Sequence, residues 1–163
     1  RKLLMVGIGG NCTADVVATL RSWDFTGYDA ILSVNPYYNK PNQEGLYRHF
    51  KAISEASPLP IMLYNIPGRT GVNMTPQTVA RIVKDCPNIF GIKEASGNKD
   101  QIMEILRNAP EGFQVLSGND DDTLWMMENG GAGIISVASN IAPKQLADFV
   151  DAIRGGYKAA NEI

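Results

Sequence analysis

Short apolar segments alternate along this chain with longer stretches in which apolar residues recur every three to four positions. The short segments are rich in aliphatic residues and apolar on both faces: residues 3–8, 30–34, 61–64, 89–92, 113–116 and 133–137. Strands of a parallel sheet that is covered on both faces have this pattern. The sequence therefore predicts six buried strands.

The longer stretches predict helices, and several of these have recognisable ends. Thr75 is a helix N-cap followed by a proline at the first helical position, and Pro143 begins another helix. The predicted buried stripe of that last helix is Leu146, Phe149, Val150 and Ile153. The remaining helices fall near residues 14–23, 44–56 and 100–108, and after the acidic triplet 120–122, whose charge favours a helix N-terminus.

The order of elements, strand then helix repeated six times, predicts one α/β domain with a parallel sheet and right-handed crossovers. An open doubly wound sheet and a (β/α)8 barrel both have this order. Six units favour the open sheet by number alone, because a barrel has eight strands and about 250 residues. However, the chain begins at Arg1 almost directly before a strand, and residues 157–163 resemble the beginning of another helix. We therefore expect a portion of a longer protein.

The charge balance and the cysteines exclude several classes of partner and site. Basic and acidic side chains number 15 and 17, so we expect no basic surface for nucleic acid or an anionic membrane. Residues 3–8, the longest apolar run, are much shorter than the roughly 20 residues of a membrane span, and no basic segment precedes them as in a signal peptide. The separation of Cys12 and Cys86 fits no metal site, and two cysteines predict a reduced, cytoplasmic protein rather than a disulfide scaffold.

Two further patterns narrow the chemistry. His49 is the only histidine and lies among polar residues of a predicted helix, so we expect it at the surface and expect no histidine-based triad or zinc site. The glycine-rich residues 7–11 lack the spacing of a dinucleotide fingerprint, which disfavours a nicotinamide cofactor. We therefore expect any acid–base chemistry to be carried out by lysine, tyrosine or carboxylate side chains.

Lys93 is the most informative candidate, because it alone among the eight lysines ends a strongly apolar strand. The carboxyl ends of parallel strands face the active site in α/β folds. Burial at such a position lowers the pKa of a lysine and makes its amine nucleophilic towards carbonyl groups. The alternative is a structural ion pair between Lys93 and Glu94 or another carboxylate.

Tyr64 ends the preceding strand, and the turn at Pro67 and Gly68 carries Arg69 over the same edge. A tyrosine there can transfer protons, and an arginine can bind a carboxylate through two hydrogen bonds. Taken singly, Tyr64 is better explained as a core residue and Arg69 as a surface charge. Together with Lys93, they form a set suited to imine chemistry. Residues 36–41 add a stiff loop with two tyrosines, suited to a pocket wall or a subunit interface.

Three motifs in this order, residues 36–41, 63–71 and 91–97, resemble the dihydrodipicolinate synthase family, and Gly118 and residues 133–137 extend the match over essentially the whole chain. This family belongs to the pyruvate-dependent class I aldolases, as does N-acetylneuraminate lyase. Arg69 favours the synthase branch. The resemblance implies a (β/α)8 TIM barrel, of which residues 1–154 cover strands three to eight and residues 155–163 begin a C-terminal helical extension. We expect these six units alone to be inactive.

The resemblance also implies an activity: condensation of pyruvate with aspartate-4-semialdehyde to 4-hydroxy-tetrahydrodipicolinate, in lysine and diaminopimelate biosynthesis. It implies no metal and no organic cofactor, because a covalent lysine imine with pyruvate supplies the electron sink. The usual assembly is a homotetramer, a dimer of dimers. Alternatives are N-acetylneuraminate lyase, another 2-keto-acid aldolase on the same scaffold, or a non-catalytic relative that retains the fold.

The resemblance assigns a role to each matching residue. The catalytic residues are Lys93, which forms the Schiff base, Tyr64, the proton donor and acceptor, and Tyr38, which extends the proton relay across a subunit interface. The substrate-binding residues are Arg69, Gly118 and Ile135. The positions of a lysine-regulatory site are Asn11, Asp15 and Tyr37. Asp15 stands where lysine-inhibited members usually have a longer glutamate, so inhibition by lysine stays an open hypothesis.

Overall fold

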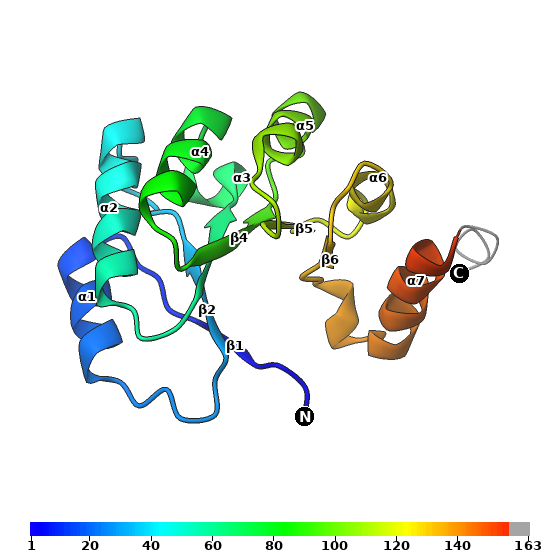
Figure 1. The fold of residues 1–163 in the computed structure, drawn as a ribbon, viewed down its shortest axis with the longest axis horizontal. Helices are drawn as coiled ribbons and strands as arrows, with labels where there is room; N and C mark the ends of the chain where they lie inside the picture. Colours follow the sequence, from blue (N-terminus) through cyan, green and yellow to red (C-terminus); the bar gives the residue numbers. More distant parts are fainter. Residues whose placement is uncertain (157–163) are drawn as a thin grey trace.

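The computed structural model describes residues 1–156 and contains six parallel strands in one sheet (Figure 1). The strands are β1 (Met5–Gly7), β2 (Ala30–Val34), β3 (Ile61–Asn65), β4 (Ile89–Glu94), β5 (Gln114–Ser117) and β6 (Gly133–Ile134). Each strand pairs with its neighbours in sequence, in the order β1-β2-β3-β4-β5-β6. A doubly wound sheet would reverse its strand order at a switch point. The unbroken order is that of a barrel segment.

Helices follow the strands and lie along the outside of the curved sheet (Figure 1). They are α1 (Thr13–Ser22), α2 (Gln43–Ala56), α3 (Pro67–Thr70), α4 (Pro76–Asp85), α5 (Lys99–Asn108), α6 (Thr123–Glu128) and α7 (Pro143–Gly155), with a short 3₁₀ helix at Ala138–Asn140. Within the described residues, β1 and β6 each pair on one side only, so the sheet is open between them.

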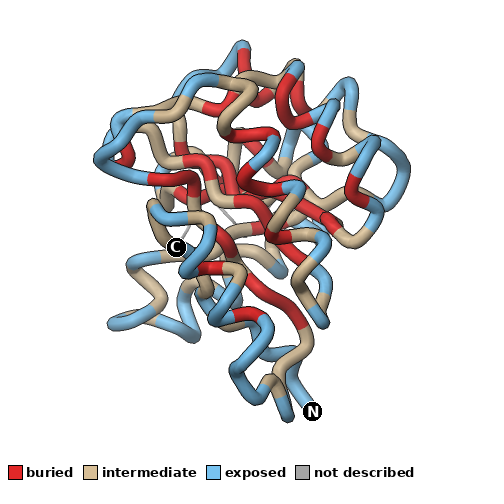
Figure 2. Tube along the Cα trace, turned by 90° about the vertical axis from the view of Figure 1, so that its left-hand side faces the viewer, coloured by how far each residue is buried: buried red, intermediate tan, exposed pale blue. Residues whose placement is uncertain are grey.

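The hydrophobic core lies between the sheet and the helices, and Figure 2 shows the buried segments along this layer. The strands contribute Ile31, Ile61, Leu63, Ile92 and Val115, and the helices contribute Leu46, Phe50, Ile53, Val79, Ile82, Ile102 and Ile105. Side chains alternate between the two faces of a strand. Tyr64 and Lys93, each next to an outward-facing core residue, therefore face the inside of the curved sheet.

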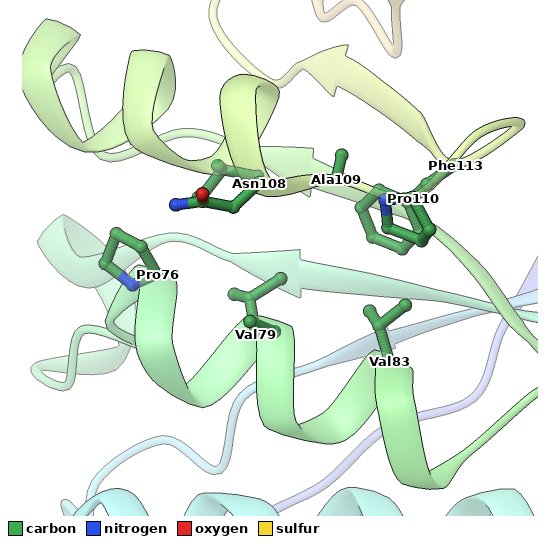
Figure 3. Close-up of a pocket in the computed structure, with 9 residues that line it drawn as sticks. Pro76, Val79, Val83, Asn108, Ala109, Pro110 and Phe113 are labelled. Atoms are coloured by element: carbon green, nitrogen blue, oxygen red, sulfur yellow. The ribbon is translucent and has the colours of Figure 1, made fainter.

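Neighbouring helices pack closely. Pro76, Val79 and Val83 of α4 face the end of α5 and the segment after it, around Pro110 and Phe113 (Figure 3). The cavity between them is only about 10 Å³, at the lower limit for holding one water molecule. This apolar seam fixes α4 against α5, and thereby the strands β3 and β4 that precede them.

The predicted helix starts are largely confirmed. The side chains of Asn42, Thr75 and Asn98 cap α2, α4 and α5 by accepting backbone N–H bonds. Pro143 begins α7 as predicted. Helix α6 begins directly after the acidic triplet, as predicted, although the Asp122 side chain does not cap it and Asp120 contacts a different loop.

The end of the chain departs from the prediction. Strand β6 has two residues instead of the predicted five, since the backbone turns into the 3₁₀ helix after Ser136. The predicted stripe of α7 is only half-buried, and no residue of that helix is fully buried. It contacts α6 and the 3₁₀ helix rather than the centre of the sheet. Of the predicted extension at 155–163, residues 157–163 lie outside the described part of the chain.

The surface placement predicted for His49 is wrong. Its side chain is 3% exposed, packs edge-to-face on Phe50, and its Nδ1 lies 2.8 Å from the Thr13 hydroxyl of α1. The polar residues beside it in sequence, Arg48 and Lys51, lie on the exposed side of α2. Their polarity therefore does not indicate whether His49, on the other side of the helix, is exposed. Burial lowers the pKa of His49 to about 4.

None of the helices in residues 1–156 combines the length and apolar character that crossing a membrane requires. In the same part of the chain, no group of three or more histidine, cysteine, aspartate or glutamate side chains is placed to hold a metal ion.

Candidate active site

Tyr64 and Lys93 are direct partners across β3 and β4, near the carboxyl ends of both strands. The Lys93 Nζ atom lies 4.1 Å from the centroid of the Tyr64 ring. This distance is within the range of a cation–π contact when the amine is charged. The structure thus brings together the two residues that the sequence predicted for imine chemistry.

Lys93 is buried, with 8% of its surface exposed. Burial lowers its pKa, and the negative charge of Asp120 opposes that shift. Among the described residues, no carboxylate forms an ion pair with Nζ. Glu94, the predicted alternative partner, instead accepts hydrogen bonds from Asn65 and Ser96. The amine is therefore available to react rather than held in a structural ion pair.

Gly118 follows β5 and adjoins the lysine. Its N–H donates to the Glu94 carbonyl over 2.8 Å. A Cβ atom at this position would lie 3.0 Å from Lys93 Cε and 2.6 Å from Ala95 Cβ. Glycine at this position therefore leaves the lysine side chain its space, which the sequence motif alone did not explain.

Tyr64 is half-buried, and its surroundings shift the pKa of its phenol. Burial raises the pKa of its phenol, and the positive charge of Arg69 opposes that shift. Arg69 is exposed and lies on the single turn of α3, where the sequence predicted a turn at Pro67 and Gly68. The helix ends at Gly71 in the left-handed region, with φ of 73°. Arg69 thus lies close enough to Tyr64 for its charge to act on the phenol.

Asp120 is a member of this site that the sequence interpretation missed. Its carboxylate accepts hydrogen bonds from the Ser136 hydroxyl and from the N–H groups of Val137 and Ala138, and the Ser136 bond is the main cause that keeps its pKa low. It therefore joins the loops after β5 and β6 and supplies negative charge near Lys93. Ile135, predicted to line the substrate site, lies in the same loop, with its N–H donating to Ser117 O over 3.0 Å.

The loop after β2 does not reach this centre. Tyr38 is 89% exposed, and its φ of 75° is unusual for a residue other than glycine. Within the described chain, Tyr38 therefore does not join Lys93 and Tyr64.

Asn11, Asp15 and Tyr37 do come together, away from Lys93. They line one cavity of about 290 Å³, with Gly10 and Thr19 also in its wall. The three positions predicted for a regulatory site thus share a hollow between the start of α1 and the loop after β2.

Comparison with known proteins decides the family. The family model described as the dihydrodipicolinate synthetase family matches residues 2–163. The chain belongs to this family. A curated 4-hydroxy-tetrahydrodipicolinate synthase from Parabacteroides distasonis is 50% identical over 161 residues, which cover 98% of this chain and 54% of that protein.

Solved structures of the dihydrodipicolinate synthetase family agree with this assignment. Dihydrodipicolinate synthase from Aquifex aeolicus matches with a TM-score of 0.93 and 41% identity, covering 98% of this chain and 55% of that one. The chloride-inhibited enzyme from Acinetobacter baumannii, complexed with pyruvate, matches with a TM-score of 0.92 and 39% identity, covering 99% and 56%. The prediction of a partial (β/α)8 barrel is confirmed. The chain spans about half the length of the relatives it matches.

Proposed function

We propose that the complete protein containing this chain condenses pyruvate with aspartate-4-semialdehyde to form 4-hydroxy-tetrahydrodipicolinate, in the biosynthesis of diaminopimelate and lysine. The observation that carries the proposal is the buried Lys93 amine, which has no carboxylate partner among the described residues and lies against the Tyr64 ring. The family of the chain and the names of its relatives agree with this reading.

In the first half of the reaction, the neutral Lys93 amine attacks C2 of pyruvate. Water leaves after proton transfer, and the C2–Nζ bond becomes an iminium. The iminium draws electrons from the neighbouring methyl group, which loses a proton and gives an enamine. We assign these proton transfers to the Tyr64 hydroxyl, with Asp120 supplying negative charge near the iminium.

In the second half, the enamine carbon attacks the aldehyde carbon and forms the new carbon–carbon bond, while the aldehyde oxygen takes up a proton. The amino group of the former semialdehyde then attacks C2, closes the ring and releases the Lys93 amine. Arg69 binds the carboxylate of the semialdehyde, and Gly118 and Ile135 line the pyruvate site. The lysine iminium serves as the electron sink in this scheme, so we propose that no metal and no organic cofactor takes part.

We further propose that the working assembly is a cytoplasmic homotetramer, in which Tyr38 enters the proton relay of a second copy. The support is physical: Tyr38 holds a large side chain in solvent at an unfavourable φ, which an interface would stabilise. The cavity of Asn11, Asp15 and Tyr37 is proposed as a lysine-regulatory site, because Asp15 offers a carboxylate to an ammonium group. Added millimolar lysine should then slow the complete enzyme.

Borohydride trapping tests the proposal. The complete encoded protein is incubated with pyruvate and borohydride, and peptide mass spectrometry locates the reduced adduct. We expect an adduct on Lys93 and none in Lys93→Met, while the exposed Lys51 serves as the internal comparison. No adduct on Lys93 would favour a non-catalytic relative.

A coupled assay with aspartate-4-semialdehyde then separates the synthase from a lyase. In the synthase, Arg69→Ala should raise the KM for the semialdehyde by roughly 30-fold or more and leave pyruvate trapping intact, because a carboxylate loses its charge-assisted partner. Trapping without turnover of the semialdehyde would favour N-acetylneuraminate lyase or another 2-keto-acid aldolase.

A further inference from the structure

A row of buried polar side chains lies on the outward face at the carboxyl ends of β2, β3 and β4. Asn35 directly follows β2, Asn65 ends β3 and Glu94 ends β4. Their exposed fractions are 0%, 0% and 1%. Polar groups buried this deeply among aliphatic residues are costly unless each is hydrogen-bonded. Imine formation uses none of these three side chains directly.

Hydrogen bonds join the row into one network. Asn35 Nδ2 donates to Asn65 Oδ1 over 2.8 Å, and Asn65 Nδ2 donates to Glu94 Oε2 over 3.0 Å. The Ser96 N–H donates to Glu94 Oε1 over 2.7 Å, and the Met74 N–H donates to Asn65 Oδ1 over 3.0 Å. Asn65 is thus the centre, and it ties the ends of three strands together through side chains alone.

The network lies directly behind the reactive pair. In the register of β3 and β4, Asn65 is opposite Glu94, and the preceding pair is Tyr64 opposite Lys93. Successive side chains point to opposite faces of the sheet. The outward pair and the inward pair therefore share the same peptide groups, so a shift of one moves the other.

Glu94 is an unusual choice for a purely structural position. Burial raises its pKa, and the hydrogen bonds from Ser96 and Asn65 lower it. Both of its oxygens accept N–H groups, and none of the four ion pairs in the described part of the chain includes it. The acceptor of these N–H groups is thus a buried carboxylate, the side-chain acceptor that is costliest to remove from water.

We propose that Glu94 and Asn65 are positioning residues for the imine-forming amine. Their hydrogen bond fixes the ends of β3 and β4 relative to each other and so holds Lys93 Nζ over the Tyr64 ring. The proposal rests on the proposed function, because it concerns the geometry of the same amine.

The first variant is Glu94→Gln, which keeps the shape of the side chain. The glutamine amide has one acceptor oxygen where the carboxylate has two. Its NH₂ group must therefore face either Asn65 Nδ2 or the Ser96 N–H, both of which are donors, and that hydrogen bond is lost. We expect the rate of pyruvate labelling of Lys93 under borohydride to fall about tenfold, because small displacements of a reacting group slow a reaction strongly.

The second variant is the swapped pair Asn65→Asp with Glu94→Gln. The carboxylate introduced at position 65 accepts from the amide introduced at position 94, and it still accepts from Asn35 and Met74 through Oδ1. Asn73 Oδ1 accepts from Asn65 Nδ2 in the unmodified protein, so the Asn73 amide must turn over to donate to the second oxygen of the new carboxylate. The Gln101 amide, which exchanges two hydrogen bonds with Asn73, can turn over with it and keep both. We expect labelling to return to within about threefold of the unmodified protein, because the interaction energy of such a pair is restored.

Tyr47→Phe is the matched control. It removes a 2.9 Å hydrogen bond to Asp85 between α2 and α4, away from Lys93. It should lower the Tm without changing the labelling rate per folded molecule. All variants are made in the complete encoded protein, and labelling is measured against pH as well as by rate.

The outcomes separate the two proposals. Slow labelling of Glu94→Gln, with recovery in the swapped pair, supports positioning. Glu94→Gln that folds and labels at the unmodified rate overturns it, as does a swapped pair that fails to fold or labels slowly. An unmodified protein that gains no adduct overturns the proposed function and this inference with it.

Discussion

His49 is a buried base that the folded chain keeps uncharged. Its Nδ1 pairs with Thr13, and burial lowers its pKa to about 4. The unfolded chain binds a proton near pH 6.5, so the unfolded state holds more protons than the folded state between about pH 6.5 and 4. The free energy of unfolding should therefore fall as the pH drops through this window. The contribution of His49 between pH 7.5 and 5 is about 2 kcal/mol.

Denaturant unfolding of the unmodified protein and of His49→Gln, at both pH values, measures this contribution. The glutamine does not titrate, so the variant should lose less stability at pH 5 than the unmodified protein does. An identical pH dependence in the two proteins would show that His49 is not the responsible group.

Among individual residues of the candidate active site, the sequence predicts some and misses others, because only some of their contacts depend on local patterns. Lys93 and Tyr64 follow apolar runs, and the ends of parallel strands meet, so their proximity could be predicted. Asp120 lies in the loop after β5, and its carboxylate is held by hydrogen bonds from the loop after β6, a contact that no local pattern indicates. Glu94 directly follows Lys93 in sequence but faces the opposite side of the sheet, and alternation alone does not say which of the two faces the inside.

Among the elements, α4 has the most complete N-terminal cap. Thr75 Oγ1 accepts from the Thr78 N–H, and the Thr75 N–H donates to Gln43 of α2 over 3.1 Å. Thr75→Ala removes the side-chain cap and should lower the free energy of unfolding by about 1 kcal/mol. Thr19→Ala is the control, because Thr19 is exposed within α1 and alanine favours a helix. Equal losses in the two variants, by urea unfolding, would contradict a specific capping effect.

The helices and strands also show which structural features local sequence patterns can predict and which they cannot. The cap at Thr75, the start at Pro143 and the strands β2 to β4 could be predicted, since they depend on residues close together in sequence. The length of β6 could not, because the turn into the 3₁₀ helix depends on Asp120 accepting from Ser136, Val137 and Ala138 across 16 or more positions. The strand order, which separates a barrel from a doubly wound sheet, is likewise a property of long-range pairing.

At the scale of the molecule, the sheet has two strands that pair on one side only in residues 1–156, β1 and β6. Residues beside β1 expose apolar side chains, with Leu3 83% and Leu4 51% exposed. A cavity of about 400 Å³ opens next to them, lined by Leu3, Leu4, Met5 and Phe90 among others. Unpaired strand edges with apolar surroundings favour association with further strands.

Residues 1–163 expressed alone should therefore turn over no pyruvate and aspartate-4-semialdehyde, whereas the complete encoded protein should. The open sheet leaves the inside of the barrel, which Lys93 and Tyr64 face, without the walls that exclude water and lower the pKa of the amine further. Light scattering should show self-association of the isolated chain, and circular dichroism should still report its helices. A coupled assay and pyruvate trapping, run side by side on both proteins, provide the measurement. Sustained turnover by a monomeric 163-residue chain would show that the six strands already enclose a working site, and Tyr38 from a second copy would then not be required.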